Sequence, residues 1–308
     1  MQASAEVRNS ALLLVGIATM GLSIKGIAAK LAYETGINAD YLLLVRFAAA
    51  VPLFWLGARW LHGSWGHLTQ RQWLHCTGAG LLYFIAAFTD FHALLYLDAG
   101  LSRLILFTYP VFVLLLQSSM QKRLPGSREL LAFAIIFAGL LVAIPIAEAQ
   151  ENLALGGLFA LAAALSYGAY LMYSQVLLQE IESGHFSTAT STITLILFAA
   201  LVLSSDADPA LNINLAGTLW SLFIAVFCTA IPFFLLYEGI KRCGAATASL
   251  ITLAGPAITL VLAWWWLDEP LGWRQWLGLA ILMAGLGLID KKLSVLHVLR
   301  KFQRQTQV

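Results

Sequence analysis

The stretch Gly244–Ile289 decides the fold of this chain, and it reads GAATASLITLAGPAITLVLAWWWLDEPLGWRQWLGLAILMAGLGLI. It holds two apolar runs, separated by a short polar turn that contains Asp268 and Glu269. Each run approaches the roughly 20 residues that a helix needs to cross a bilayer. The stretch therefore predicts a pair of membrane-spanning helices.

An earlier part of the sequence repeats this stretch at a constant offset of 146 residues, so that AGLSRLILFTYPVFVLLL mirrors AATASLITLAGPAITLVLA. The aligned pairs include Pro110 with Pro256, Gly126 with Gly272 and Gly139 with Gly285. Five predicted spans precede the second copy. Because five is odd, the two copies cross the membrane in opposite directions, which is the inverted repeat of secondary transporters.

The composition agrees with a membrane protein. Of 308 residues, 60% are hydrophobic and 11% charged, and the mean hydropathy is +0.81. Soluble domains are about 45–50% apolar and about 25% charged. These values argue against a water-soluble enzyme, and a net charge of +2 without a basic stripe argues against a nucleic-acid partner.

Ten segments have the length and apolarity of membrane spans. They are Asn9–Ala32, Tyr41–Leu61, Trp73–Leu97, Leu101–Met120, Leu130–Ala147, Leu155–Leu178, Phe186–Ser204, Ala216–Ile240, Ala245–Leu267 and Trp273–Ile289. The remainder forms short loops and two short tails. We therefore expect an all-α membrane protein with residues 1–150 and 151–290 as two inverted five-helix repeats.

The distribution of Lys and Arg predicts the orientation, since cytoplasmic loops carry an excess of both. With the N-terminus in the cytoplasm, thirteen of the 18 fall in inside segments and only Arg274 in an outside loop. Both termini are thus predicted to be cytoplasmic. Residues 291–308 form a basic amphipathic tail that we expect on the inner leaflet.

The quoted stretch resembles the drug/metabolite transporter superfamily, in its EamA-like branch. The matching positions are Pro256, Glu269, Gly272, Gly278 and Gly285. The resemblance implies a ten-helix secondary transporter that exports or exchanges amino acids or related metabolites by alternating access. The first repeat departs from the pattern, because Lys122 and Arg123 stand where Asp268 and Glu269 do in the second.

Charged residues inside spans are costly and mark functional sites. Counted from the outer ends, Lys25 and Asp90 lie about 12 Å deep, and Arg46 and His92 about 9 Å deep. Lys25 is therefore level with Asp90, and Arg46 with His92 or Asp90. We predict that Lys25, Arg46 and Asp90 bind substrate, although a structural ion pair between helices remains the alternative.

The excess of cations over Asp90 indicates a substrate with a carboxylate or phosphate, which Arg binds bidentately. Lys30 and Arg103 lie only about one turn inside their spans, so both are expected to reach the interface. Tyr109, Tyr167 and Tyr170 are predicted to line the cavity and to stack on a planar solute; ordinary helix packing is the alternative.

Four further residues are candidates for the transport cycle. His92 and Glu238 match under the offset, and either can couple transport to protons if partly buried. Pairing of Glu238 with Lys241 or Arg242, and an interfacial hydrogen bond of His92, are the structural alternatives. Pro110 and Pro256 each remove a helical hydrogen bond and are predicted to kink their helices.

The sequence offers neither Cys/His ligand spacing nor a Walker A motif, so we expect no metal, no cofactor and no ATPase activity. Two alternatives stay open: a channel or facilitator of the same fold, and a membrane enzyme acting on lipid phosphates. The expected partners are a small solute and membrane lipids, with protons, a counter-solute and a homodimer left open. Short termini favour a bacterial inner membrane.

Overall fold

The computed structural model of the chain describes residues 2–62, 68–120, 122, 124–143, 152–178, 180–204, 214–236, 252, 254–269 and 271–289. Within these ranges the regular structure is entirely helical. The helices are α1 (Gln2–Glu34), α2 (Ala39–His62), α3 (Gln70–Ala93), α4 (Ala99–Leu106), α5 (Tyr109–Met120), α6 (Ser127–Ala143), α7 (Leu153–Leu177), α8 (Ser183–Ser204), α9 (Leu215–Ala225), the π-helical η2 (Val226–Ala230), α12 (Gly255–Leu267) and α13 (Trp273–Ile289).

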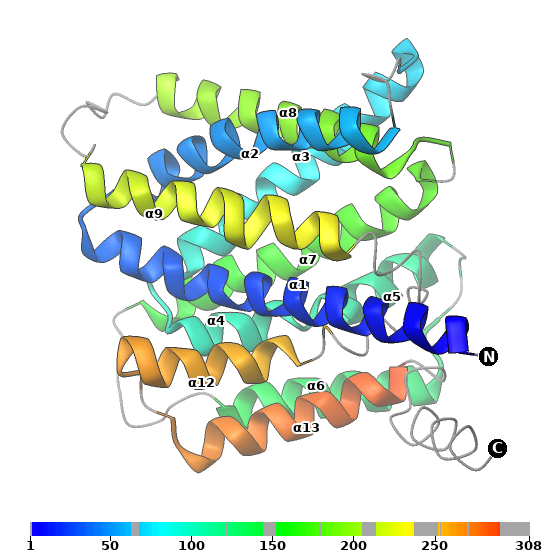
Figure 1. Ribbon diagram of the computed structural model, residues 1–308. Helices are drawn as coiled ribbons and strands as arrows, with labels where there is room; N and C mark the ends of the chain where they lie inside the picture. The colour runs from blue at the N-terminus through cyan, green and yellow to red at the C-terminus, as the bar shows by residue number, and fades with distance from the viewer. Residues whose placement is uncertain are drawn as a thin grey trace.

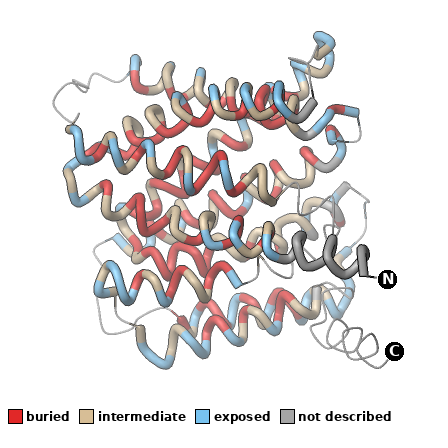
Figure 2. Tube along the Cα trace, viewed as in Figure 1, coloured by how far each residue is buried: buried red, intermediate tan, exposed pale blue. Residues whose placement is uncertain are grey.

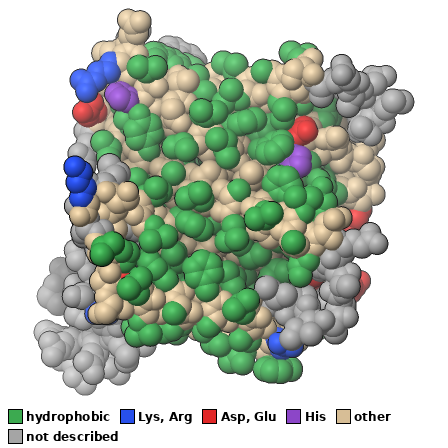
Figure 3. Space-filling model, turned by 180° about the vertical axis from the view of Figure 1, so that it is seen from behind, with side chains coloured by type: hydrophobic (Ala, Val, Ile, Leu, Met, Phe, Trp, Pro, Cys, Tyr) green, Lys and Arg blue, Asp and Glu red, His purple; other side chains and the backbone are tan. Residues whose placement is uncertain are grey.

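The helices lie side by side in one bundle (Figure 1). Six described segments are long and apolar enough to cross a membrane, and residues 99–113 and 255–267 are shorter apolar helices. Hydrophobic side chains cover the face seen in Figure 3, and most charged ones lie toward its edges. The chain is therefore an integral membrane protein. The count of ten spans and the cytoplasmic location of both termini stay predictions.

The two-repeat architecture is visible in the helix bounds. Helices α6 and α13 each have 17 residues, and both ends of α13 follow those of α6 by the offset found in the sequence. A methyl group on Gly139 would lie 2.7 Å from the backbone nitrogen of Leu282, and one on Gly285 would lie 2.7 Å from Ile136. Ile136 and Leu282 are themselves repeat mates. The contact is thus self-complementary, as an approximate two-fold relation requires.

The most extensive of the other helix contacts obey the same exchange. Helix α1 packs on α9 and α12, and its repeat mate α7 packs on α3 and α5. Helix α2 packs on α9 as its mate α8 packs on α3, and α2 and α8 pack on each other. Exchanging the repeats leaves this set of neighbours unchanged. In Figure 1 the first residues of α1 and the last residues of α13 lie at the same end of the bundle.

Two prolines stand at the start of helices, which differs from the prediction. Pro110 and Pro256 were expected to kink continuous helices. Instead α4 ends at Leu106 and α5 begins at Tyr109, so Pro110 stands in the first turn of a new helix. Pro256 likewise stands in the first turn of α12. The first turn of a helix suits proline because the N–H groups there have no helical partner.

A third proline widens a helix. The N–H of Ile231 bonds to the carbonyl of Val226, five residues back, which makes η2 a π-helical turn. Pro232 follows, and its ring would clash with a carbonyl four residues earlier in a regular α-helix. The widened turn removes that clash, and it contains the fully buried Thr229. Such π turns occur frequently at functional sites.

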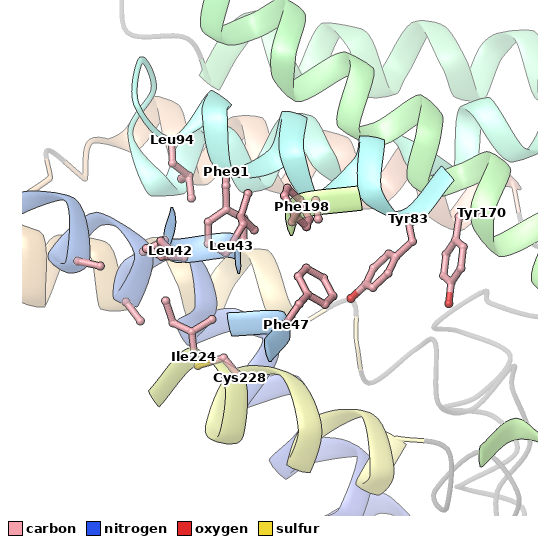
Figure 4. Close-up of a cluster of buried hydrophobic side chains, with 14 of the residues drawn as sticks. Leu42, Leu43, Phe47, Tyr83, Phe91, Leu94, Tyr170, Phe198, Ile224 and Cys228 are labelled. Carbon is pink, nitrogen blue, oxygen red and sulfur yellow. The ribbon is translucent and has the colours of Figure 1, made fainter. Parts of the chain in front are cut away.

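The buried residues gather in the interior, where helices of both repeats meet (Figure 2). Figure 4 shows part of this core, in which Phe47 and Tyr83 point toward each other. The ring of Phe47 stacks on Phe198 at 5.4 Å and meets the edge of Tyr83 at 5.7 Å. Tyr83 in turn stacks on Tyr170 at 5.0 Å. This aromatic packing forms a wall behind the site described next.

Candidate functional site

A cavity of about 140 Å³ lies between the repeats. Helices α1 to α4 and the start of α5 contribute its walls from the first repeat, and α7, η2 and α12 from the second. Five of the six residues predicted to bind substrate line it: Lys25, Arg46, Asp90, Tyr109 and Tyr167. The structure thus brings together residues that lie up to about 140 positions apart in the sequence.

Asp90 holds two cations. Lys25 Nζ donates to Asp90 Oδ2 at 3.0 Å, as their equal predicted depth suggested. The other carboxylate oxygen, Oδ1, accepts a hydrogen bond from Arg103 Nη2. Lys25 comes from α1, Asp90 from α3 and Arg103 from α4, so the carboxylate ties three helices of the first repeat together.

The prediction that Arg103 reaches the interface is wrong, because its side chain turns inward to Asp90 and the residue is 3% exposed. A carboxylate in a low-dielectric interior attracts a guanidinium strongly, and this interaction replaces the water that Arg103 would meet at the surface. Gly26 of α1 lies beside this side chain, and a methyl group there would lie 3.4 Å from Arg103 Nε, an ordinary van der Waals contact. Helical depth alone does not reveal this turn.

Arg46 is held without an acid. The residue is 2% exposed, and its Nε donates to Thr229 Oγ1 in η2 at 3.0 Å. Its guanidinium carbon lies 4.8 Å from the ring centroid of Phe47 and 5.0 Å from that of Phe91. Nη1 has no hydrogen-bond partner within the described residues. Among them no carboxylate lies within 4.0 Å of this guanidinium, and Arg46 pairs with neither predicted neighbour, His92 nor Asp90.

The tyrosines divide into two groups. Tyr109 and Tyr167 line the cavity and meet edge to face at 5.2 Å. Tyr170 lies behind this wall, stacked between Tyr83 and Phe186, and does not line the cavity. The alternative given in the sequence analysis, helix packing, therefore describes Tyr170, whereas Tyr109 and Tyr167 present an aromatic surface to the cavity.

Of the two residues considered for proton coupling, only His92 is among the described residues. His92 Nδ1 is 2.8 Å from the carbonyl of Phe88, and Nε2 is 3.5 Å from Asp40 Oδ1. His92 also stacks on Phe88 at 3.9 Å and is not part of the cavity wall. Glu238 and the tail lie outside the described residues.

A second polar cluster joins the two repeats in the turns after α3 and α12. The carboxylate of Glu269, in the turn after α12, accepts hydrogen bonds from the backbone N–H groups of Ala99 at 2.6 Å and Gly100 at 3.1 Å. Lys30 Nζ lies 3.8 Å from Glu269 Oε1 and 3.9 Å from Asp98 Oδ1. Burial raises the pKa of Glu269, and the backbone hydrogen bonds oppose that shift. Glu269 thus joins the second repeat to the first turn of α4.

Comparison with known proteins gives a consistent result. Residues 9–144 and 154–289 each match the model of the EamA-like transporter family. The chain is 31% identical over 277 residues to the uncharacterized transporter YcbK of Bacillus subtilis, which covers 86% of this chain and 87% of the relative. It is 27% identical over 260 residues to the uncharacterized transporter sll1319 of Synechocystis, covering 81% and 78%.

A solved crystal structure shares the fold. Its TM-score with this chain is 0.63, with 91% of this chain and 96% of the other covered at 18% identity. The likeness extends over both repeats, so it concerns the whole bundle rather than one half.

Proposed function

The chain belongs to the EamA-like transporter family, and from this premise we propose that it is a secondary active transporter of a small organic metabolite such as an amino acid or an organic anion. It works as an exporter or exchanger. One observation carries the proposal: the central cavity between the repeats combines charged and aromatic side chains in its wall. Sites at the interface of inverted repeats are the usual place for substrate in such carriers.

Alternating access is the proposed mechanism. The Glu269 cluster bridges the repeats at the end that the loop charges predict to be outside. From Lys25 the cavity continues along α1 to Ser23, Leu22 and Thr19, toward the predicted cytoplasmic end. This arrangement supports an outer end that is closed by Glu269. Opening it requires Glu269 to leave the N–H groups of Ala99 and Gly100.

The topology and location complete the proposal. Ten spans with both termini in the cytoplasm place the Glu269 cluster outside and the N-terminal half of α1 inside. The curated relatives come from Bacillus and Synechocystis, which supports a bacterial inner membrane. The basic tail 291–308 then faces the anionic inner leaflet.

Counterflow in proteoliposomes tests this function. Vesicles holding the purified full-length protein are preloaded with one unlabelled solute and given a trace of the same solute with a label. The panel contains amino acids and organic anions of similar size. A carrier accumulates label transiently and saturates with concentration. Flux that rises linearly with concentration would indicate a channel, and protein-free vesicles are the control.

Absence of counterflow for every solute of the panel would overturn the proposed carrier function. Turnover of a solute without flux would instead indicate an enzyme.

A further inference from the structure

We propose that the central cavity selects solutes with a net negative charge and that Arg46 binds their oxyanion group, a carboxylate or a phosphate. The inference rests on the proposed transport function and narrows it, because it excludes zwitterionic amino acids and cations as preferred substrates. Four features of the site carry it: its charge, the two ion pairs of Asp90, the orientation of the Arg46 side chain and the aromatic wall.

The charge of the cavity wall is the first feature. Among the described residues that line the cavity, Lys25, Arg46 and Arg103 are basic and Asp90 alone is acidic. Two positive charges therefore lack a counter-charge within the described part of this wall. Unpaired charge at membrane depth is costly, and such residues normally pair or face water. A bound anion supplies the missing charge.

The two ion pairs of Asp90 are the second feature. One carboxylate oxygen accepts from Lys25 and the other from Arg103, so both oxygens are engaged. The ammonium group of an amino acid or amine would need a carboxylate partner. The described part of the wall offers no second acid. A zwitterion would thus leave its ammonium beside cations, and like charges in a low-dielectric site repel strongly.

The orientation of the Arg46 side chain is the third feature. Thr229 accepts from Nε, and Phe47 and Phe91 lie against the guanidinium. These contacts fix the group before any ligand arrives, which reduces the entropy lost on binding. Nη1 stays unpartnered although Arg46 is buried. An oxyanion provides the acceptors that this planar donor group needs, and it can do so bidentately.

The remaining wall suggests the body of the solute. Tyr109, Tyr167 and Phe107 border the cavity, and its volume of about 140 Å³ suits a small organic molecule. Aromatic rings stack on planar groups and contact alkyl groups well. We therefore expect a small organic acid or phosphate ester whose apolar part lies against these rings and whose anionic end reaches Arg46.

A matched set of probes tests the selectivity on the purified full-length protein in detergent. The probes share a phenyl ring and differ in charge: 3-phenylpropionate, phenyl phosphate, phenylalanine, 3-phenylpropylamine and 3-phenyl-1-propanol. Thermal unfolding midpoints are measured against probe concentration, since a ligand that binds the native state raises the midpoint. We expect saturable stabilisation by the two anions only, and the stronger of the two identifies the preferred oxyanion.

Variants of two arginines on α2 test the role assigned to Arg46. Arg46→Gln should weaken anion binding about tenfold or more, because the variant loses the positive charge and the charge-assisted hydrogen bonds to the oxyanion. Arg46→Lys should recover part of the loss. Arg59→Gln removes the same charge from an exposed position of the same helix and should leave anion binding unchanged.

A further variant, Thr229→Val, keeps the inference testable if Arg46→Gln fails to fold. Thr229→Val keeps the guanidinium but removes the hydroxyl that orients it, so anion affinity should fall several-fold. Equal anion affinity in wild type, Arg46→Gln and Thr229→Val would remove Arg46 from the site. Stabilisation by phenylalanine or by the amine as strong as that by the anions would overturn the charge selectivity, as would no stabilisation by either anion.

The same probes separate this inference from the proposed function. Counterflow of phenylalanine without counterflow of either anion would leave the carrier function standing and remove the anion preference. Absence of counterflow for every solute would remove the carrier function itself.

Discussion

Replacing Asp90 by Asn should destabilise the protein strongly, because two cations share its carboxylate. Lys25 and Arg103 would face a neutral amide that offers one acceptor and two unwanted donors. The Asp90 and Arg103 side chains are 6% and 4% exposed, and that of Lys25 is 18% exposed. Removing one partner of a buried pair costs about 3–5 kcal/mol, and the partial exposure of Lys25 favours the lower end.

A loss of about 3 kcal/mol corresponds to a fall of roughly 6–12 °C in the unfolding midpoint for a chain of this size class. The assay is thermal unfolding of purified protein in detergent, followed by intrinsic tryptophan fluorescence. Asp98→Asn is the matched control. Asp98 and Lys30 are each 25% exposed and 3.9 Å apart, and such pairs are worth about 0–1 kcal/mol.

The double variant Asp90→Asn/Arg103→Gln makes the reasoning sharper. It removes one of the stranded cations, so it should be less destabilised than the sum of its single variants. A midpoint for Asp90→Asn within the range of Asp98→Asn would refute the assigned role of the carboxylate. A double variant whose loss of stability equals or exceeds the sum of the losses in the two single variants would also refute it.

Three further predictions concern the ends and edges of the bundle. Glu269 has a pKa above its ordinary 4.5 when the outer end is closed, so the closed form holds the proton more tightly than a water-exposed form. The closed form should therefore become more stable as the pH falls through the range between the raised pKa of Glu269 and its ordinary value. Transport should slow there, and Glu269→Gln should lose this dependence; an unchanged profile in the variant would contradict it. Gly139→Leu should lower the free energy of unfolding by about 1–3 kcal/mol or more, because its Cβ would meet backbone atoms 2.7 and 2.8 Å away. Gly287→Leu, whose Cβ meets nothing within 4 Å, is the control. If His92 couples protons, His92→Gln should flatten the pH dependence of flux, and an identical pH profile would leave it structural.

Much of the architecture follows from regularities that a sequence displays directly. The offset that aligns Pro110 with Pro256 also relates α6 to α13, because repeated turns and glycines fix where helices begin and pack. The pairing of Lys25 with Asp90 was foreseeable as well, since helical rise converts residue number into depth.

The rotation of each helix about its axis is a different matter. It decides whether a side chain faces lipid, a neighbour or the cavity, and the packing of several helices sets it. Arg103 turned inward and Tyr170 turned into the core for this reason. The sequence did not identify Thr229 as a site residue, because its position beside Arg46 depends on the π turn that precedes Pro232. Residue number thus specifies how deep a side chain lies in the membrane, whereas the direction in which it points is set by the packing of the helices.

Among the described residues that line the cavity, basic side chains outnumber acidic ones by two, and this excess of positive charge also makes the proposed carrier sensitive to voltage. If access to the cavity switches from one side to the other, an empty site carries its charge through part of the transmembrane field. The energy is about 2.3 kcal/mol per elementary charge per 100 mV, so two charges crossing the full field amount to about 4.6 kcal/mol. An inside-negative potential then holds the empty site toward the cytoplasm. A bound dianion cancels this charge, so the potential does not oppose the switch of the loaded form from one side to the other, whereas it holds the empty form open to the cytoplasm.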